Sequence, residues 1–343
     1  MDSSNIRNTL FQRRSDPVSQ AEVPRVGAAA RDKEEIAMSA QYAIAQPMRI
    51  QARRGSPAEQ RYYHQSALPE PWRMPKAIAN GVSPRPLEDL IFHGGRIVPQ
   101  MLFQNIYCGS SADWHGSDVE KIDAAITAAM RDKRLNNVMA QYFHGTALSC
   151  DPLASLTLAD QKPTLFDEPD VQAKIVTLFR SGQIRASDLE STLFNLVLPR
   201  GSVLALGDSD SLNGLGGYHG SVHVQHNGRR VTLYYSANVF SEGNNGIPAF
   251  DTPWKNVVAT LYHELNEFRT DADVKDAIET GDNDFLGWMS RFGRECGDEP
   301  IAVAAQLDLV FQEVLTASAG KVPVQFMYSN VVHGPEGPID HQR

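Results

Sequence analysis

The chain has 343 residues, of which 42% are hydrophobic and 21% are charged, and its formal net charge is −9 at pH 7. No apolar run reaches the roughly 20 residues that a membrane-spanning helix needs. The acidic balance argues against a nucleic-acid-binding surface, which would carry a basic footprint. This length suits one large domain or two modest ones.

The N-terminal part of the chain differs in composition from the rest. Residues 1–85 are rich in Arg, Gln, Ala, Ser and Pro, and such a composition offers few groups to bury. We interpret them as a flexible or surface-hugging arm with one short helix over residues 32–46. Residues 1–20 contain no apolar stretch typical of a secretory signal peptide, so we expect a protein that stays inside the cell or leaves it by another route. Residues 86–335 predict a folded domain, and residues 336–343 a C-terminal tail.

Hydrophobic periodicity and capping residues predict the elements of this domain in chain order. They are a strand within residues 95–109, helices over 117–143, 168–182 and 186–199, a short buried strand over 201–208, a hairpin over 220–240, helices over 251–268 and 299–320, and a final strand over 322–332. Ser117 and Thr252 stand where helix caps are expected, and Asn227-Gly228 is a strong hairpin-turn signal. The mixture predicts a single α+β domain with a mixed or antiparallel sheet packed by helices.

The three cysteines, Cys108, Cys150 and Cys296, are too few for a disulfide framework and lack the spacing of a zinc ribbon. We expect three buried thiols. One disulfide plus a free thiol is the alternative.

Residues 260–273 read TLYHELNEFRTDAD and contain His263-Glu264-x-x-Glu267, where a zinc protease carries His-Glu-x-x-His. Residues four apart share one face of a helix, so His263 and Glu267 can present a nitrogen and an oxygen to one metal ion. Glu264 lies beside them, where a general base could take a proton from a metal-bound water. The alternative is an acidic amphipathic helix with a solvated face.

A third ligand must come from elsewhere in the chain. If the helix continued, Asp271 would lie about 12 Å along its axis from His263. Asp273 stands where the metzincin family of zinc proteases carries its third metal ligand. In this sequence, however, Thr270 replaces the glycine at which the chain of a metzincin turns. The polar run of residues 269–271 is expected to finish the helix on the surface.

Glu295 and Asp298 are the better candidates for the third ligand, because they lie in a glycine-punctuated segment that can fold back over the helix. Glu295 is preferred for its longer side chain, with the other carboxylate orienting His263 from behind. One histidine and two carboxylates would cancel the charge of a divalent ion. The ion would therefore acidify its bound water less than an ion held by two histidines and one carboxylate does. Zn²⁺ is the expected ion, and oxygen-rich ligation also admits Mn²⁺ or Ca²⁺.

Tyr218 and His219 stand in GGYHGS at the start of a predicted strand, where side chains can reach a cleft. They are candidates for polarising a substrate carbonyl or stabilising an oxyanion. A Tyr/His pair that packs at a sheet edge is the alternative. The segment lacks the spacing of a phosphate loop, and no nucleophile elbow indicates a serine hydrolase.

The motif is accompanied by others in a fixed order. HELNEFRTD, the pair Gly287-Trp288, GRECGD over residues 293–298 and VQFMYSN over residues 324–330 together resemble a pattern of bacterial proteins related to the plant EXORDIUM, or phosphate-induced, family. The resemblance covers most of residues 90–332. The chain departs from the pattern in Cys296 and Tyr328, and in a predicted helical insertion over residues 300–319.

This resemblance implies a zincin-like domain, a metal centre and secretion. The paired cysteines expected of a secreted relative are missing, so neither export nor disulfides are carried over. A zincin-like hydrolase acting on peptides or proteins is the expected function. The alternative is a non-catalytic binding or signalling domain in which a metal, or none, braces the fold.

Overall fold

The computed structural model describes residues 78–340. The predicted helix over residues 32–46 and most of the predicted arm lie outside the described residues. The α-helices of the described part are α3 (Asp118–Arg131), α4 (Lys133–Met139), α5 (Glu168–Arg180), α6 (Pro253–Thr270), α7 (Val274–Thr280) and α8 (Asp298–Val303). Its 3₁₀ helices are η1 (Pro86–Glu88), η2 (Ser111–Asp113), η3 (Ala140–Tyr142), η4 (Leu189–Ser191), η5 (Ser211–Asn213), η6 (Asn283–Phe285) and η7 (Leu307–Leu309).

A six-stranded mixed sheet forms the centre of the fold, with the order β3-β2-β6-β10-β9 and β4 paired to β2. Its strands are β2 (Gln100–Tyr107), β3 (Ser149–Pro152), β4 (Leu156–Thr157), β6 (Thr192–Val197), β9 (Gly217–His226) and β10 (Arg229–Asn238). All neighbours are parallel except β9 and β10, which form an antiparallel hairpin. The predicted hairpin and the predicted α+β class with a mixed sheet are confirmed.

The other strands pair outside this sheet. They are β1 (Leu90–Phe92) with β11 (Trp288–Ser290), β7 (Val203–Leu206) with β5 (Leu165–Phe166) and β8 (Ser209–Asp210), β12 (Phe311–Thr316) with β13 (Gly320–Gln325), and β14 (Met327–Ser329) with β15 (Gly334–Glu336). The three cysteines are buried and free, as expected. Among the described residues, no helix combines the length and the apolar character needed to cross a membrane.

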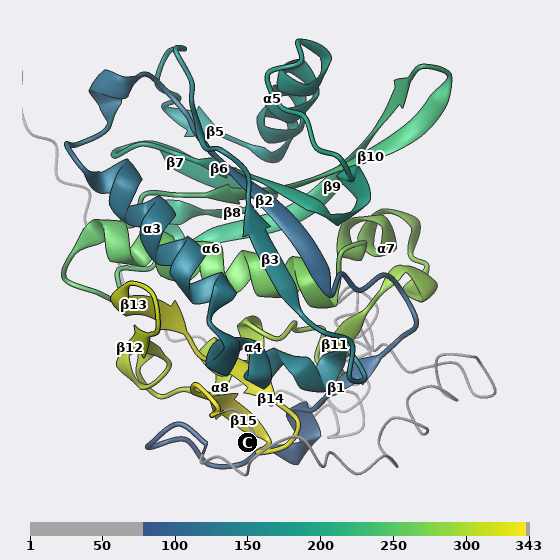
Figure 1. Ribbon diagram of the computed structural model, residues 1–343, viewed down its shortest axis with the longest axis vertical. Coiled ribbons are helices and arrows are strands. Elements are labelled where there is room, and N and C mark those ends of the chain that lie inside the picture. Colours follow the sequence, from purple (N-terminus) through teal and green to yellow (C-terminus); the bar gives the residue numbers. More distant parts are fainter. Residues whose placement is uncertain (1–77, 341–343) are drawn as a thin grey trace, which may run out of the picture. The chain divides into compact units, whose positions relative to one another are not determined.

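Helices cover both faces of the central sheet (Figure 1). Helices α3 and α6 pack on one face, and α5 packs on the other. Neighbouring residues of one strand point to opposite faces, so Tyr234 of β10 contacts Phe268 of α6, whereas the hydroxyl of Tyr235 accepts a hydrogen bond from Gln172 of α5. The sheet therefore separates two hydrophobic cores.

The helix predicted over residues 186–199 is wrong, because this segment contains η4 and strand β6. All residues of β6 are buried between β2 and β10. A strand covered on both faces shows a continuous apolar run, which periodicity alone cannot separate from a buried helix.

The prediction of a helix over residues 299–320, which includes the predicted helical insertion, is wrong for the residues that follow α8. Strand β12 follows α8 and pairs antiparallel with β13. Exposed and buried residues alternate over Glu313–Thr316 in β12, which is the period of a half-buried strand. The strand predicted over residues 322–332 is divided into β13 and β14, and β15 follows them.

The predicted helix over residues 117–143 breaks at Asp132. Its carboxylate accepts hydrogen bonds from the backbone N–H groups of Arg134 and Leu135 and thereby caps α4. Ser117 and Thr252 stand at the predicted N-cap positions of α3 and α6, but neither side chain makes a capping hydrogen bond.

The folded domain extends beyond the predicted bounds of 86–335. Ile78, predicted to belong to the arm, pairs with Glu336. Ile339, predicted to belong to the tail, is buried, and its backbone N–H donates to the carbonyl of Arg134. These apolar residues close the end of the domain formed by β14 and β15.

Helix α6 is buried along almost its whole length, from Asn256 to Thr270. Pro253 begins it at a position where the missing N–H costs nothing. The sheet and α3 cover one side of the helix, and β13 covers another. A surface helix would bury one stripe only, so the polar residues of α6 must find partners inside the protein.

We expect Leu265→Ala to lower the free energy of unfolding by about 2–5 kcal/mol, because the side chain is fully buried in α6 and its loss leaves a cavity. Leu315→Ala, at a side chain that is 63% exposed, is the matched control and should change it by less than about 0.5 kcal/mol. Urea unfolding followed by circular dichroism measures both. Equal losses would show that α6 is not the centre of the core.

Candidate metal centre

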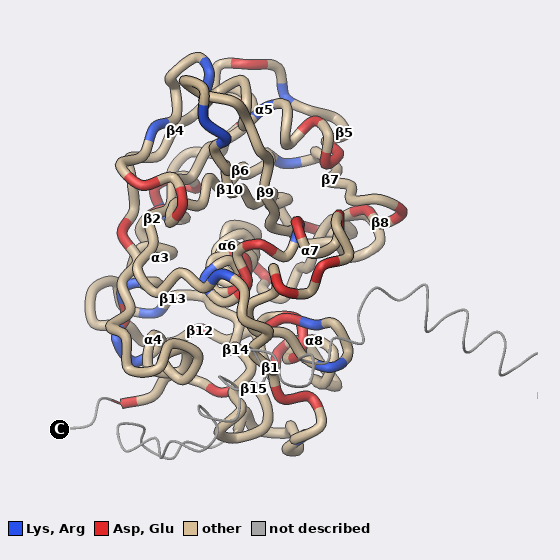
Figure 2. Tube along the Cα trace, turned by 90° about the vertical axis from the view of Figure 1, so that its right-hand side faces the viewer, with Lys and Arg blue, Asp and Glu red and all other residues tan. Residues whose placement is uncertain are grey.

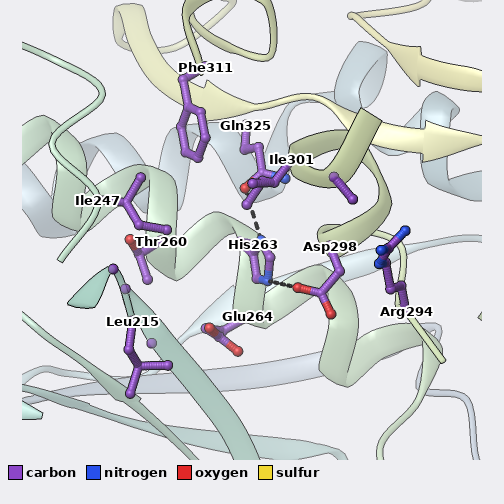
Figure 3. A pocket seen from close by; sticks show the side chains of 14 residues that line it. Leu215, Ile247, Thr260, His263, Glu264, Arg294, Asp298, Ile301, Phe311 and Gln325 are labelled. Carbon is purple, nitrogen blue, oxygen red and sulfur yellow. Dashed lines mark hydrogen bonds and ion pairs between the residues drawn. The ribbon is translucent and has the colours of Figure 1, made fainter. Parts of the chain in front are cut away.

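Helix α6 brings the three motif residues together beside a cleft. His263, Glu264 and Glu267 are 9%, 2% and 3% exposed. His263 Nε2 lies 3.0 Å from Glu267 Oε2 across one helical turn, as their spacing predicts. His263 and Glu264 line the cleft, where both side chains are seen in Figure 3.

The hydrogen bond that His263 makes to Gln325 determines which nitrogen of the neutral ring carries the hydrogen. Gln325 Nε2 donates to the carbonyl of Gly297, so its amide oxygen faces His263 Nδ1 at 2.9 Å. An amide oxygen can only accept, so Nδ1 donates, and the Nε2 lone pair of the neutral ring points toward Glu267. Histidines that bind metals usually have such an acceptor behind the ring.

The carboxylate of Glu267 also holds the segment that carries Asp298. Glu267 Oε1 accepts hydrogen bonds from the backbone N–H groups of Gly297 and Asp298, each at 3.1 Å. Gly297 permits this approach, because a Cβ atom there would lie 2.5 Å from His263 Nδ1. Asp298 Oδ1 consequently lies 3.8 Å from His263 Nε2, the pair joined by a dashed line in Figure 3.

His263, Glu267 and Asp298 offer three ligand atoms that all lie within 4.8 Å of one another. The sequence favoured Glu295 over Asp298 as the partner of His263, and the structure instead brings Asp298 there. The turn anchored on Glu267 directs Asp298 to the cleft. Glu295 precedes this turn and points inward, with its Oε1 3.7 Å from His219 Nε2.

His219 of β9 lies behind Glu264 rather than in the cleft. Its Nε2 is 3.2 Å from the backbone carbonyl of Asp271, which can only accept, so Nε2 carries the hydrogen. The Nδ1 lone pair then faces Glu264 Oε2 at 3.4 Å and Glu267 Oε2 at 3.8 Å. His219 does not line the cleft, so the predicted contact with a substrate carbonyl has no support in this geometry.

Tyr218, predicted to act together with His219, lies on the opposite face of the sheet. Its ring packs 6.4 Å from that of Tyr235, in the core on the α5 side. Adjacent residues of a strand point to opposite faces, so the two predicted partners are separated by the sheet.

The end of α6 is buried, which corrects the expectation that residues 269–271 reach the surface. Arg269, Thr270 and Asp271 have no exposed area. Asp271 Oδ1 accepts a hydrogen bond from the backbone N–H of Gly287 at 2.7 Å. Asp273, the other second-choice ligand, is bound to the hydroxyl of Tyr234 and does not join His263.

The cleft has a volume of about 340 Å³ and two unlike walls. His263, Glu264, Asp298 and Arg294 form a polar wall, as Figure 3 shows. The large apolar side chains of the lining are Leu215, Ile247, Ile301 and Phe311, and Thr260 and Gln325 also border the cleft.

Carboxyl groups dominate the electrostatics of the centre, and acidic residues gather around α6, α7 and α8 (Figure 2). Burial raises the pKa values of Glu264 and Glu295, and it raises the pKa of Asp271 to about 8. Burial lowers the pKa of His263, but the charge of Glu267 outweighs it and holds that pKa well above its ordinary value. The centre therefore attracts positive charge, as protons or as a metal ion.

Comparisons of the chain with family models, curated proteins and solved structures give no match. The resemblance to EXORDIUM-related proteins therefore stays a prediction.

The sequence patterns did not predict a role for Gln325. It is the one polar side chain in the run VPVQF over residues 322–326, and an isolated polar residue in such an apolar run was a signal for it.

We expect Gln325→Leu to weaken Zn²⁺ binding by roughly 10- to 100-fold, because His263 Nδ1 loses the acceptor that sets its tautomer. Competition with a chromogenic chelator measures the affinity. Gln312→Leu on β12, where the amide donates to backbone carbonyls, is the matched control. Equal affinities in both variants would show that Gln325 does not orient a ligand.

Proposed function

We propose that this protein is a zincin-like, metal-dependent hydrolase that cleaves peptides, in keeping with its resemblance to EXORDIUM-related proteins. The observation that carries the proposal is the orientation of His263. Its Nε2 lone pair faces Glu267 and Asp298 beside a cleft that Glu264 also lines. A nitrogen lone pair and two carboxylates repel one another, and a cation between them turns this repulsion into attraction.

His263, Glu267 and Asp298 would hold the ion. Their one nitrogen and two carboxylates suit Zn²⁺, with Mn²⁺ or Ca²⁺ as alternatives. When bound, the ion supplies Lewis-acid chemistry, acidifying a water molecule and polarising the scissile carbonyl.

Glu264 would act as the general base. A Cβ atom at Gly217 would lie 2.9 Å from Glu264 Oε1, so the glycine keeps the side of the cleft next to this oxygen open. Burial raises the pKa of Glu264, which brings it closer to the range in which a carboxylate accepts a proton efficiently. Glu264 takes the proton of the attacking water and returns it to the leaving amine.

A peptide substrate is supported by the edge of the sheet. Strand β9 ends the order β3-β2-β6-β10-β9 and has no further strand beside it among the described residues. Its first residue, Gly217, and the preceding residues Gly214, Leu215 and Gly216 border the cleft. An extended peptide can hydrogen-bond to such an edge, and the apolar wall then receives a side chain next to the reacting bond.

A structural metal is the second candidate, and the deep burial of Glu267 favours it. Two carboxylate ligands cancel the charge of a divalent ion and leave little to acidify water. In that case His263→Ala should lower the melting temperature together with loss of the ion, and wild-type protein should cleave nothing.

We expect Glu264→Gln to lower peptide cleavage by about 10²- to 10⁴-fold while the melting temperature and the ion held by His263 are kept. Cleavage of a mixed peptide digest is followed by mass spectrometry of new termini. Glu190→Gln, at a 71% exposed side chain, is the matched control. Wild-type protein isolated without chelators that holds well below one equivalent of divalent ion would refute the proposal, as would full cleavage by Glu264→Gln.

A further inference from the structure

Three buried carboxylate oxygens on the inner side of the centre have no hydrogen-bond partner. They are Glu264 Oε2, Asp271 Oδ2 and Glu295 Oε1. All three residues are more than nine-tenths buried. A buried polar atom without a partner costs about 1–3 kcal/mol, and more when charged. Glu295 Oε1 faces His219 Nε2 at 3.7 Å, whereas Glu264 Oε2 faces His219 Nδ1, the opposite nitrogen of the ring, at 3.4 Å. On the Nδ1 side, Glu264 Oε2 is therefore the oxygen that a bound cation would satisfy.

A second group of ligand atoms lies on this inner side. His219, Glu264 and Glu267 offer atoms that all lie within 4.8 Å of one another. The carbonyl of Asp271 fixes the hydrogen of His219 on Nε2, so the Nδ1 lone pair faces the two glutamates. This group shares Glu267 with the outer group of His263 and Asp298.

The charges of the centre leave room for two divalent ions. Five carboxylates surround the two imidazoles, those of Glu264, Glu267, Asp271, Glu295 and Asp298. Among the described residues, none of the five makes an ion pair with Lys or Arg. Asp298 has a side chain that is 49% exposed, so water screens its charge. In ionised form the four buried carboxylates carry −4, so one divalent ion leaves about −2 and two leave about 0, and uncompensated buried charge is costly.

We propose a second, inner divalent-cation site formed by His219 Nδ1, Glu264 Oε2 and Glu267, with Glu267 shared between two ions. It deepens the proposed function and rests on it for the outer ion. Paired sites in hydrolases hold ions about 3.5–4 Å apart. A nitrogen and two carboxylates suit Mn²⁺ or Zn²⁺.

The two oxygens of Glu264 have separate roles in this arrangement. Oε1 lies on the side of Gly217 and the cleft, and Oε2 faces His219. The inner ion thus orients the carboxylate that serves as the base, and His219 positions that carboxylate without touching the substrate.

Metal-free protein is titrated with Mn²⁺, and the bound ion is counted after gel filtration by mass spectrometry. We expect two equivalents in the wild type and in His223→Leu, a control on the same strand whose histidine pairs with Asp276. His219→Leu should keep one equivalent. One equivalent in saturated wild type would overturn the inner site and indicate that a proton shared by His219 and Glu264 occupies it. Two equivalents in His219→Leu would overturn the inner site as proposed, because the second ion would then bind without His219.

The wild type alone also tests the inner site, should His219→Leu fail to fold. Two Mn²⁺ ions joined by one carboxylate are magnetically coupled, so the electron paramagnetic resonance spectrum at saturation should differ from that at half an equivalent. A spectrum that only grows in intensity would contradict a shared ligand. Two coupled ions without peptide cleavage would refute the proposed hydrolase activity and support the inner site. Peptide cleavage with a single bound ion would refute the inner site and support the hydrolase activity.

Discussion

The carboxylate of Glu267 joins three parts of the chain that are far apart in sequence. One oxygen accepts hydrogen bonds from the backbone of Gly297 and Asp298 at the start of α8. The other faces His263 on its own helix and His219 on the edge strand. This side chain, together with Gln325, which donates to the carbonyl of Gly297, holds the start of α8 and thus the side of the cleft that carries Asp298.

Such a centre depends on the burial of α6, which is buried from Asn256 to Thr270 apart from the side that borders the cleft. In the interior, electrostatic interactions are stronger than at the surface, and an unpaired charge is correspondingly costly. Arg269 shows the same constraint away from the centre, since it is fully buried and its guanidinium donates to Asn136. The buried polar side chains of this helix thus form hydrogen bonds with specific partners, and these hydrogen bonds orient the side chains.

Local patterns in the sequence predict the parts of the fold that local interactions determine. Pro253 and the apolar spacing that follows it predict α6, and Asn227-Gly228 predicts the hairpin of β9 and β10. Both failures, over residues 186–199 and 299–320, are strands whose apolar residues also fit a helix, and pairing with distant strands decides between the two. Tertiary contacts override propensity at these positions.

The same distinction applies to the candidate centre. His263 and Glu267 are four residues apart, so their meeting follows from helix geometry alone. His219 and Gln325 come from other strands, and no spacing predicts that they meet α6. A backbone carbonyl behind one imidazole and an amide oxygen behind the other leave both remaining lone pairs facing Glu267. Because the surrounding fold sets both tautomers, the ligand atoms are oriented before any ion binds, which lowers the entropic cost of binding one.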